Sequence, residues 1–488
     1  MKHFLSALLL CTGFVSVLPA QNTPWLLTLD EAMNMTLTEN PQIKASAYET
    51  EAAIKERKAT YGLRLPKINV TGAYAYLSED IGFDLNGLKD PIGGIMNNMS
   101  SLLPPPILNQ ASELMKTDWS IPLQDRSFGT VGANISIPIY TGGKINAANR
   151  AAKIKVGESQ QQDQRNRNSL VSELVERYYG LSLALQVTEV RKQVLEGMRQ
   201  HLHDAVELEK NGIIARGERL YAEVSSAEAE RNYLESIKTV ETLRSALGNT
   251  LNSEAEFTPV STMFILEEIE SVDHFKQMAQ THSPILKQVS LKHDLAVEGM
   301  KLQRADFAPQ IALMGAASFY NYQVTSLMPR WAVGAGVTFK IFDGLGREHK
   351  YSAARSQIRQ VEALGQKANN DVFTLIDKLY NEMLTYKEKF PSLETSYAFA
   401  VEYLRIKEEA FKEGMASSSD VVDARLNLAK IKTERLQAAY YYDLMLARLL
   451  EACGLSQSLP EYAKRSTAQH IQYLNAPEQL QTSTLSQQ

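Results

Sequence analysis

The chain has 488 residues and a formal net charge of −5, with 44% hydrophobic and 22% charged residues. This mild acidity argues against nucleic acid as a partner. Of the 2 cysteines, Cys11 lies in the apolar N-terminal run interpreted below as a signal, so the mature chain is expected to keep only Cys453, which excludes an internal disulfide framework and a cysteine-built metal site. No nucleophile–base pattern, phosphate loop or metal-ligand spacing stands out, so we expect no catalytic residues, cofactor or metal, and hence no enzyme.

The N-terminus predicts an export signal over residues 1–20. Lys2 and His3 precede an apolar run over 4–17, and Leu18-Pro19-Ala20 places a small residue before a cut at Gln21. The run is too short to span a membrane as a helix, and no later stretch approaches ~18 consecutive apolar residues. The mature chain is therefore expected to be exported and to begin near residue 21.

The chain contains a duplicated half-molecule. Residues 40–76 match 283–319, and a second match begins near residue 131 with a shorter offset, which leaves an insertion of 41 residues in the first copy between 77 and 130. A period of this length exceeds the roughly 20–50 residues of a solenoid unit. We therefore expect two structural repeats, over 28–250 and 268–454.

Each repeat is expected to begin with a helix and to change to strands after a proline. Helix is predicted over 28–65, with Asn40 as a cap followed by Pro41 in a first turn. The helix-to-strand junctions are Pro66 and Pro309. Strands are predicted near 67–77, 130–140, 310–320 and 331–342. Their length of about 9–11 residues is that of a tilted transmembrane β-strand, but a half-buried soluble sheet alternates in the same way. The alternation alone does not decide between these readings.

Very long helices are expected after the strands. The break signals are Asn211-Gly212 and Glu413-Gly414, so each repeat is predicted to end in two antiparallel helices of roughly 60 and 30 residues, with a kink at Pro391. His201 and His203 lie within one of these helices. Their i, i+2 spacing does not place both rings on one face, so we interpret them as solvated histidines.

Four strands per chain cannot close a barrel, which needs about eight or more, and lipid tolerates no open sheet edge. If the strands enter a membrane, several copies must share one barrel. The long insertion between the first two strands is then predicted to be an outside loop that packs locally, because outer loops of such barrels are usually the longer ones.

These features together resemble the outer-membrane efflux protein family, often called the TolC family. The second tip, residues 413–424, reads EGMASSSDVVDA and is close to that family's Gly-x5-Asp-Val-Leu-Asp-Ala pattern. The resemblance spans roughly 28–454 and implies one channel-tunnel unit over 21–454. It implies a homotrimer whose twelve-stranded outer-membrane β-barrel is continued by a long α-helical barrel in the periplasm. The tail, 455–488, is expected to be equatorial or disordered.

The same resemblance implies the location and the partners. The chain is expected in the outer membrane of a Gram-negative-type cell, surrounded by lipid, as the passive exit duct of a tripartite efflux or type I secretion system. A periplasmic adaptor and an inner-membrane pump would be its partners, and small molecules its cargo. The alternative is a periplasmic or surface coiled-coil scaffold without channel activity, whose strands form an ordinary small sheet.

The candidate site residues lie at the helical tips. Asp420 and Asp423 share a helix face at i, i+3, and by resemblance they form a ring of carboxylates at the periplasmic aperture. The alternative is that Asp420 only caps the helix that follows. Glu218 and Tyr221 occupy the matching positions of the first repeat. The tyrosine–arginine lock of the family is replaced here by Phe411 and Ala416, which suggests apolar closure.

The two glycine turns have a second implied role. By resemblance, Gly212 with Ile213 and Gly414 with Met415 dock onto the hairpins of the adaptor. The alternative is that both glycines only terminate helices, since glycine accepts the left-handed conformation found there.

Overall fold

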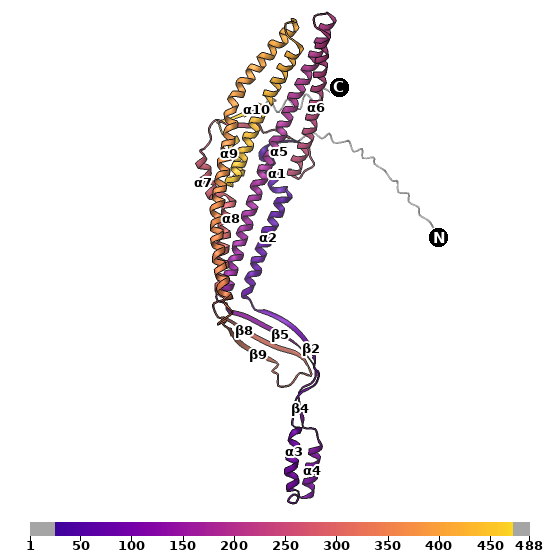
Figure 1. Cartoon of the computed structure of the whole chain (residues 1–488), viewed down its shortest axis with the longest axis vertical. Helices are drawn as coiled ribbons and strands as arrows, with labels where there is room; N and C mark the ends of the chain where they lie inside the picture. Colours follow the sequence, from indigo (N-terminus) through magenta and orange to yellow (C-terminus); the bar gives the residue numbers. More distant parts are fainter. Residues whose placement is uncertain (1–24, 472–488) are drawn as a thin grey trace, which may run out of the picture. The chain divides into compact units, whose positions relative to one another are not determined.

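The computed structural model describes residues 25–471, which fall into two units. One unit comprises residues up to 51 together with 157–291 and 363 onward, and the other comprises 52–156 and 292–362 (Figure 1). The expected signal peptide and residues 472–488 lie outside the described range. Among the described helices, none is long and apolar enough to cross a membrane.

The first unit is dominated by long helices whose lengths repeat. Helices α5 and α9 have 67 residues each, and α6 and α10, which follow them, have 36 each. The helices of this unit are α1 (Leu29–Glu39), α2 (Pro41–Tyr61), α5 (Lys144–Lys210), α6 (Arg216–Leu251), α7 (Val272–His282), α8 (Pro284–Ala305), α9 (Gly346–Lys412), α10 (Ser418–Cys453) and α11 (Leu459–Ala463), of which α2, α5, α8 and α9 continue into the second unit.

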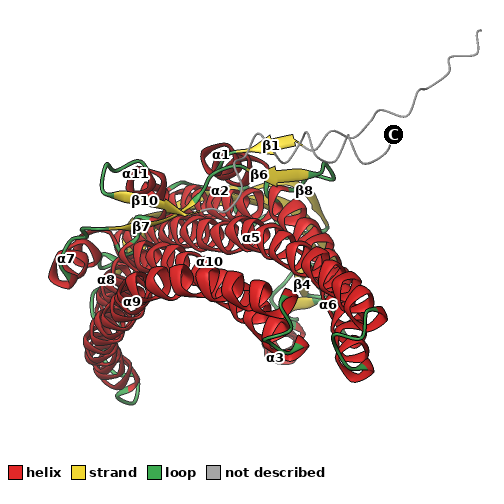
Figure 2. Cartoon of the chain, turned by 90° about the horizontal axis from the view of Figure 1, so that it is seen from above, coloured by secondary structure: helices red, strands yellow, loops and turns green. Residues whose placement is uncertain are grey.

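Two prolines mark positions within these helices that the sequence also singles out. The helix expected over 28–65 is divided into α1 and α2 at Asn40, because Pro41 starts a new helix and the Asn40 amide donates to the carbonyl of Thr250 at 2.8 Å. Pro391, where a kink is expected, lies inside α9, which is one helix from Gly346 to Lys412. Figures 1 and 2 both place α5 and α10 between α6 and α9.

Short elements that the sequence did not reveal pack beside the long helices. Strand β1 (Trp25–Leu27) pairs in parallel with β6 (Phe257–Pro259), and β7 (Met263–Leu266) pairs antiparallel with β10 (Ala468–Ile471). Helix α7 and strand β7 both contact α10. Part of the C-terminal tail is therefore ordered against the helices.

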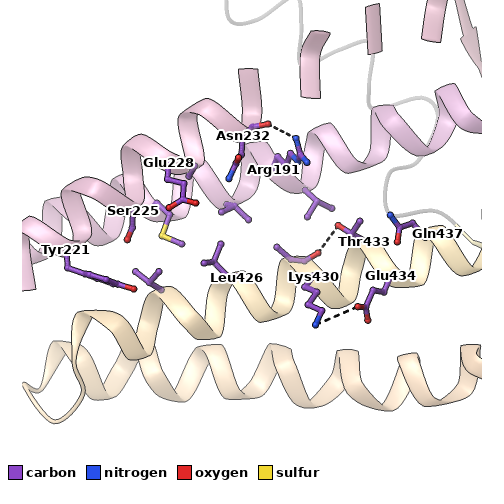
Figure 3. A pocket seen from close by; sticks show the side chains of 16 residues that line it. Arg191, Tyr221, Ser225, Glu228, Asn232, Leu426, Lys430, Thr433, Glu434 and Gln437 are labelled. Carbon is purple, nitrogen blue, oxygen red and sulfur yellow. Dashed lines mark hydrogen bonds and ion pairs between the residues drawn. The ribbon is translucent and has the colours of Figure 1, made fainter. Parts of the chain in front are cut away.

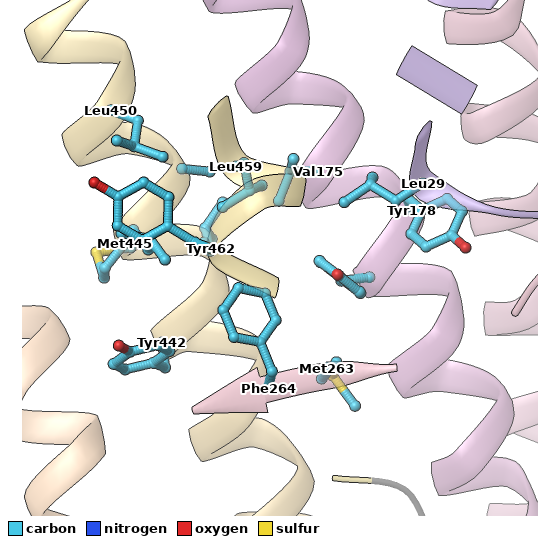
Figure 4. Packing of buried hydrophobic residues seen from close by; sticks show 14 of the residues in the cluster. Leu29, Val175, Tyr178, Met263, Phe264, Tyr442, Met445, Leu450, Leu459 and Tyr462 are labelled. Carbon is cyan, nitrogen blue, oxygen red and sulfur yellow. The ribbon is translucent and has the colours of Figure 1, made fainter. Parts of the chain in front are cut away.

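A hydrophobic core joins these short elements to α5 and α10 (Figure 4). Tyr178 on α5 is fully buried, and its hydroxyl donates to the carbonyl of Leu27 at 2.7 Å while accepting from the N–H of Ser261 at 2.9 Å. Phe264 on β7 lies edge-on to Tyr442 on α10, with ring centroids 6.4 Å apart. Aromatic burial and satisfied backbone groups thus fix the position of β1 and β6.

The second unit contains an antiparallel sheet in the order β2-β5-β8-β9. Its strands are β2 (Lys67–Tyr76), β5 (Ser127–Tyr140), β8 (Gln310–Tyr322) and β9 (Trp331–Thr338). Strands β2 and β9 are the edges, and neither has a further partner in the described chain. Of all residues in these strands, only Gly129 is buried.

The register of the sheet separates two kinds of side chain. Residues directly opposite each other share a face, so pairs such as Ile68–Ile135 and Gly315–Val333 define one face, and Asn69–Asn134 defines the other. The first face carries Ile68, Val70, Tyr74, Val131, Ala133, Ile135, Ile137, Ile311, Leu313, Ala317, Trp331, Val333, Ala335 and Val337. The second carries Asn69, Thr71, Ala73, Thr130, Gly132, Asn134, Ser136, Ala312, Met314, Ala316, Ser318, Gly334 and Gly336.

The insertion between β2 and β5 is structured, where a loop was expected. Strands β3 (Ile81–Asp84) and β4 (Ser120–Gln124) form a hairpin, and between them lie α3 (Lys89–Met99) and α4 (Pro105–Lys116). In Figure 1 these two helices run side by side beyond β4. The matching link in the second repeat, residues 323–330, is short.

Candidate functional site

The tips of the two long helix pairs end in the same backbone motif. Gly212 and Gly414 have φ of +72° and +70°, a region that glycine enters without strain. After each glycine the next N–H reaches back to the final turn of the helix: Ile213 donates to Leu208 at 2.9 Å, and Met415 donates to Ala410 at 2.8 Å. This is the Schellman arrangement, so both glycines terminate their helices.

The structure brings the two tips into contact. A Cβ added to Gly414 would lie 3.4 Å from Cγ2 of Ile213. Ile213 is 56% exposed and Met415 is 77% exposed, so an apolar side chain projects from each turn. Beneath them, Phe411 is buried with Ala205, Ala222 and Val421, and Ala416 packs against the same cluster. The four residues expected to dock an adaptor therefore lie on one surface: Gly212, Ile213, Gly414 and Met415.

Asp420 is the third residue of α10 and completes a capping box in which Ser417, not Asp420, is the N-cap. Its carboxylate accepts from the N–H of Ser417 at 3.0 Å, the Ser417 hydroxyl accepts from the N–H of Asp420 at 3.2 Å, and Lys407 lies 3.1 Å from Oδ1. The hydrogen bonds from Ser417 and the nearby ammonium of Lys407 lower the pKa of Asp420 to about 2. The carboxylate is therefore ionised at any physiological pH, and Lys407 partly balances its charge.

Asp423 differs from Asp420 in having no such partner. It is exposed on α10, and among the described residues it forms no ion pair or hydrogen bond. In the first repeat the matching Tyr221 is 43% exposed, whereas Glu218 is used for a contact between the repeats. Of the two aspartates, Asp423 is thus the one whose carboxylate has no partner among the described residues.

A buried polar cluster joins the two helix pairs just below the turns. The carboxylate of Glu218 on α6 accepts from the N–H of Ser418 on α10 at 2.6 Å. The Ser418 hydroxyl lies 2.6 Å from Nε2 of His201 on α5, and the His201 ring lies 4.5 Å from that of Phe411. His201 is only 4% exposed, so the expectation that it is solvated was wrong; His203 is exposed as expected.

The sequence contains signals that would have identified this cluster. Ser417-x-x-Asp420 is a capping-box pattern. His201 continues the buried stripe of Leu195, Met198 and Ala205 at spacings of three and four residues, so its inward position follows from helical periodicity. The contact of Glu218 with the other repeat has no local signal.

A groove lies beside the tips between α5, α6 and α10 (Figure 3). It encloses about 440 Å³ and has an apolar floor that includes Met198, Val422 and Leu426. Its rim is polar: Arg191 donates to the carbonyl of Asn232 at 2.8 Å. The groove is open to solvent and extends the exposed surface of the tips along the helices.

A proline stands at the helix-to-strand junction of each repeat. Pro66 and Pro309 each directly precede a strand, β2 and β8. At the strand-to-helix junction of the second repeat, between β9 and α9, the Arg347 guanidinium donates to the carbonyls of Lys340 at 2.8 Å and Ile341 at 3.2 Å. These contacts fix the entry into α9.

No group of three or more His, Cys, Asp or Glu side chains between residues 25 and 471 is arranged to hold a metal ion.

Comparison with known proteins identifies the family. The profile described as outer membrane efflux protein matches residues 32–251 and 276–455. The chain belongs to the outer membrane efflux protein family. Its fold is the TolC-like one, its location is the outer membrane, and its function is that of an efflux channel. The family is made of channels rather than enzymes.

Solved structures share the fold of this efflux protein at low sequence identity. A membrane protein from Pseudomonas aeruginosa is 15% identical, with a TM-score of 0.70, over 88% of this chain and 92% of its own. The outer membrane protein VceC from Vibrio cholerae is 15% identical, with a TM-score of 0.66, over 87% of this chain and 96% of its own. The CmeC outer membrane channel of Campylobacter jejuni is 16% identical, with a TM-score of 0.68, over 93% of this chain and 89% of its own. No curated protein matches the sequence.

Proposed function

We propose that three copies of this efflux protein form one passive exit duct, in which their sheets close a twelve-stranded barrel. The observation that carries this proposal is the four-stranded sheet with open edges at β2 and β9 and no covering layer on either face. Exposed strand edges are not tolerated in lipid, so β9 of one copy pairs with β2 of the next. Two copies would already supply the eight strands that a barrel needs, so the number three rests on the resemblance to the TolC family.

The two faces of the sheet suit a barrel wall. The apolar face, with Ile68 and Val333 exposed by 68% and 77%, contacts lipid, and the face of small and polar residues lines the lumen. Ten residues of β2 rise about 34 Å, which a tilt of about 40° reduces to about 26 Å, close to the ~25 Å apolar band of such barrels. Tyr74, Tyr320 and Trp331 gather at one end of the apolar face, as in an interfacial aromatic belt.

Exposed apolar stripes on the long helices support the same assembly. On α6, Leu220, Val224 and Leu234 are exposed and recur at helical spacing, and on α9 Phe399 and Ile406 are exposed. Because α6 and α9 lie toward opposite sides of the helix layer (Figure 2), each stripe is positioned to meet a neighbouring copy. The closed helical wall then continues the duct through the periplasm.

The duct works in this proposal with an adaptor and a pump. The projecting Ile213 and Met415 form, with Gly212 and Gly414, an apolar surface for the hairpins of a periplasmic adaptor, and an inner-membrane pump supplies energy and selectivity. Asp423, with Asp420, lines the aperture. Small molecules are the proposed cargo, and no chemistry occurs in the duct.

The mass of the purified protein in detergent tests this proposal. Light scattering after size exclusion is expected to give three chains per particle, and the particles are expected to form ion-conducting pores in planar bilayers. A folded monomer that stays soluble without detergent would instead support the scaffold alternative and overturn the proposal.

A further inference from the structure

The helical hairpin α3–α4 stands on a stem that is continuous with the sheet. The N–H of Leu77 donates to the carbonyl of Arg126 at 2.7 Å, which extends the β2–β5 ladder toward β3 and β4. The Gln124 side chain donates to the carbonyl of Gln323 at 2.6 Å and accepts from the N–H of Thr325 at 2.8 Å. The stem is thereby tied to both hairpins of the sheet.

The hairpin has no core of its own. No residue from 77 to 128 is buried. Helix α3 has 11 residues and α4 has 12, lengths at which an isolated helix is marginal in water. Polar contacts between the Asn86 amide and Asp118 hold only the base of the hairpin. Its distal part therefore needs burial against another surface.

Each helix carries an unpartnered apolar stripe. On α3, Ile92, Ile95 and Met99 are exposed by 37%, 61% and 46%, and their spacings of three and four residues place them on one face. On α4, Ile107 and Leu114 are exposed by 49% and 62% at a spacing of seven. Both stripes stay accessible after the two helices lie side by side.

The charge pattern favours a neutral apolar partner. The 22 residues from 91 to 112 include no charged side chain. The four charged residues of the two helices lie at the base, where Lys116 pairs with Glu113, Lys89 lies over the Trp119 ring, and Asp90 belongs to the first turn of α3. A partner recognised by charge would find nothing to bind, whereas identical copies would meet without repulsion.

We propose that the α3–α4 hairpins of three copies pack against one another through these stripes and form a helical bundle above the barrel rim. This inference rests on the proposed trimer. Twelve strands about 4.8 Å apart and tilted by about 40° enclose a circle about 24 Å across. Two helices of about 10–12 Å each span that width, so hairpins that rise from three points of the rim lie within contact distance of one another.

Cysteine cross-linking of the full-length protein tests the bundle. Ile95→Cys with Leu114→Cys places thiols on both stripes, and Asn97→Cys with Asn109→Cys is the matched control on the opposite helix faces, which are also exposed. The native Cys453 is buried, so the unmodified chain supplies the baseline. Purified trimers are treated with a short bis-maleimide, reduced and separated under denaturing conditions.

The bundle predicts covalent dimers and trimers from the stripe variant, at least fivefold above the control variant. Equal or absent cross-linking in particles that still contain three chains would overturn the bundle and leave the proposed duct intact. In that case, labelling of the stripe thiols by a lipid-soluble but not a water-soluble maleimide would identify the membrane as the partner instead. A particle mass of one chain would overturn the proposed duct itself.

Discussion

Glu218 caps a helix of the other repeat, because its carboxylate accepts the N–H of Ser418 at 2.6 Å. In the second repeat the matching residue, Asp420, caps its own helix through Ser417. The duplicated halves thus use equivalent carboxylates differently. The result is a polar link between α6 and α10 directly below the tips, which couples the two turns proposed to meet an adaptor.

Replacing Glu218 with Ala should loosen the start of α10. Loss of a helix cap costs about 0.5–2 kcal/mol, so amide hydrogen exchange in residues 418–422 should accelerate by about 2- to 30-fold. Glu228→Ala, an exposed carboxylate further along the same helix, is the control. Unchanged exchange in the Glu218 variant would mean that the contact contributes nothing to the stability of the tip.

His201 should make the same link sensitive to acid. Burial, and next the charge of Arg425, lower the pKa of His201, while Asp204 and Glu218 oppose the shift. A histidine with a lowered folded-state pKa stabilises the fold above its ordinary value near 6.5 and loses that contribution as the pH falls. After correction for the intrinsic slowing of amide exchange at lower pH, the protection of residues 418–422 should therefore fall between pH 7 and pH 5, and His201→Gln should remove that fall.

Local sequence patterns carry the parts of this fold that local physics determines. The fold class and the family are confirmed, since proline junctions, period-two segments and glycine turns are each readable within a few residues. The Schellman turns at Gly212 and Gly414 are of this kind, because the left-handed backbone is a property of the glycine itself. Such features need no knowledge of neighbouring elements.

The features that were missed depend on what packs beside each element. His201 was taken as solvated because one helix was considered without α9 and α10 around it. The Glu218–Ser418 bond joins residues 200 positions apart, and only the packing of α6 against α10 brings them together. Helices α3 and α4 were missed because Gly93-Gly94 and Pro104-Pro105-Pro106 are typical of loops, yet proline is compatible with the first turn of α4.

Asp443 is predicted to destabilise the core at alkaline pH. It is fully buried, and one oxygen accepts from the N–H of Phe264 at 3.1 Å while the other has no partner. Burial raises the pKa of Asp443 well above its ordinary value, so the neutral acid is preferred and stability falls as the pH rises. Asp443→Asn should therefore unfold later than the unmodified protein at pH 8, with a smaller difference at pH 5.

A second variant separates charge from hydrogen bonding at this position. Asp443→Leu removes the charge but leaves the Phe264 N–H without an acceptor, which costs about 1–3 kcal/mol. It should lower the thermal midpoint at both pH values. Equal behaviour of the Asn and Leu variants would show that the hydrogen bond to Phe264 is unimportant.

The two aspartates of the tip should contribute unequally to ion selectivity. Asp420 is neutralised in part by Lys407 and held by Ser417, whereas Asp423 is exposed and unpaired among the described residues. In the proposed trimer the three Asp423 carboxylates therefore supply most of the field that attracts cations at the aperture. Asp423→Asn should reduce cation preference in planar bilayers, and block by a trivalent cation such as lanthanum, more than Asp420→Asn does.

The stability of the tip should depend more on Asp420 than on Asp423, which is the opposite of the order expected for ion selectivity. The two variants therefore separate a structural role from a role in selectivity. The lowered pKa of Asp420, about 2, means that its capping and pairing stabilise the tip above the ordinary aspartate pKa of about 3.9 and are lost as the pH falls toward 2. Asp420→Asn should accelerate amide exchange in residues 418–422, and Asp423→Asn should not. If Asp420→Asn instead abolished selectivity and Asp423→Asn left it unchanged, the free carboxylate would not be the one that faces the permeating ions. The aperture would then have to be assigned to another part of the tip.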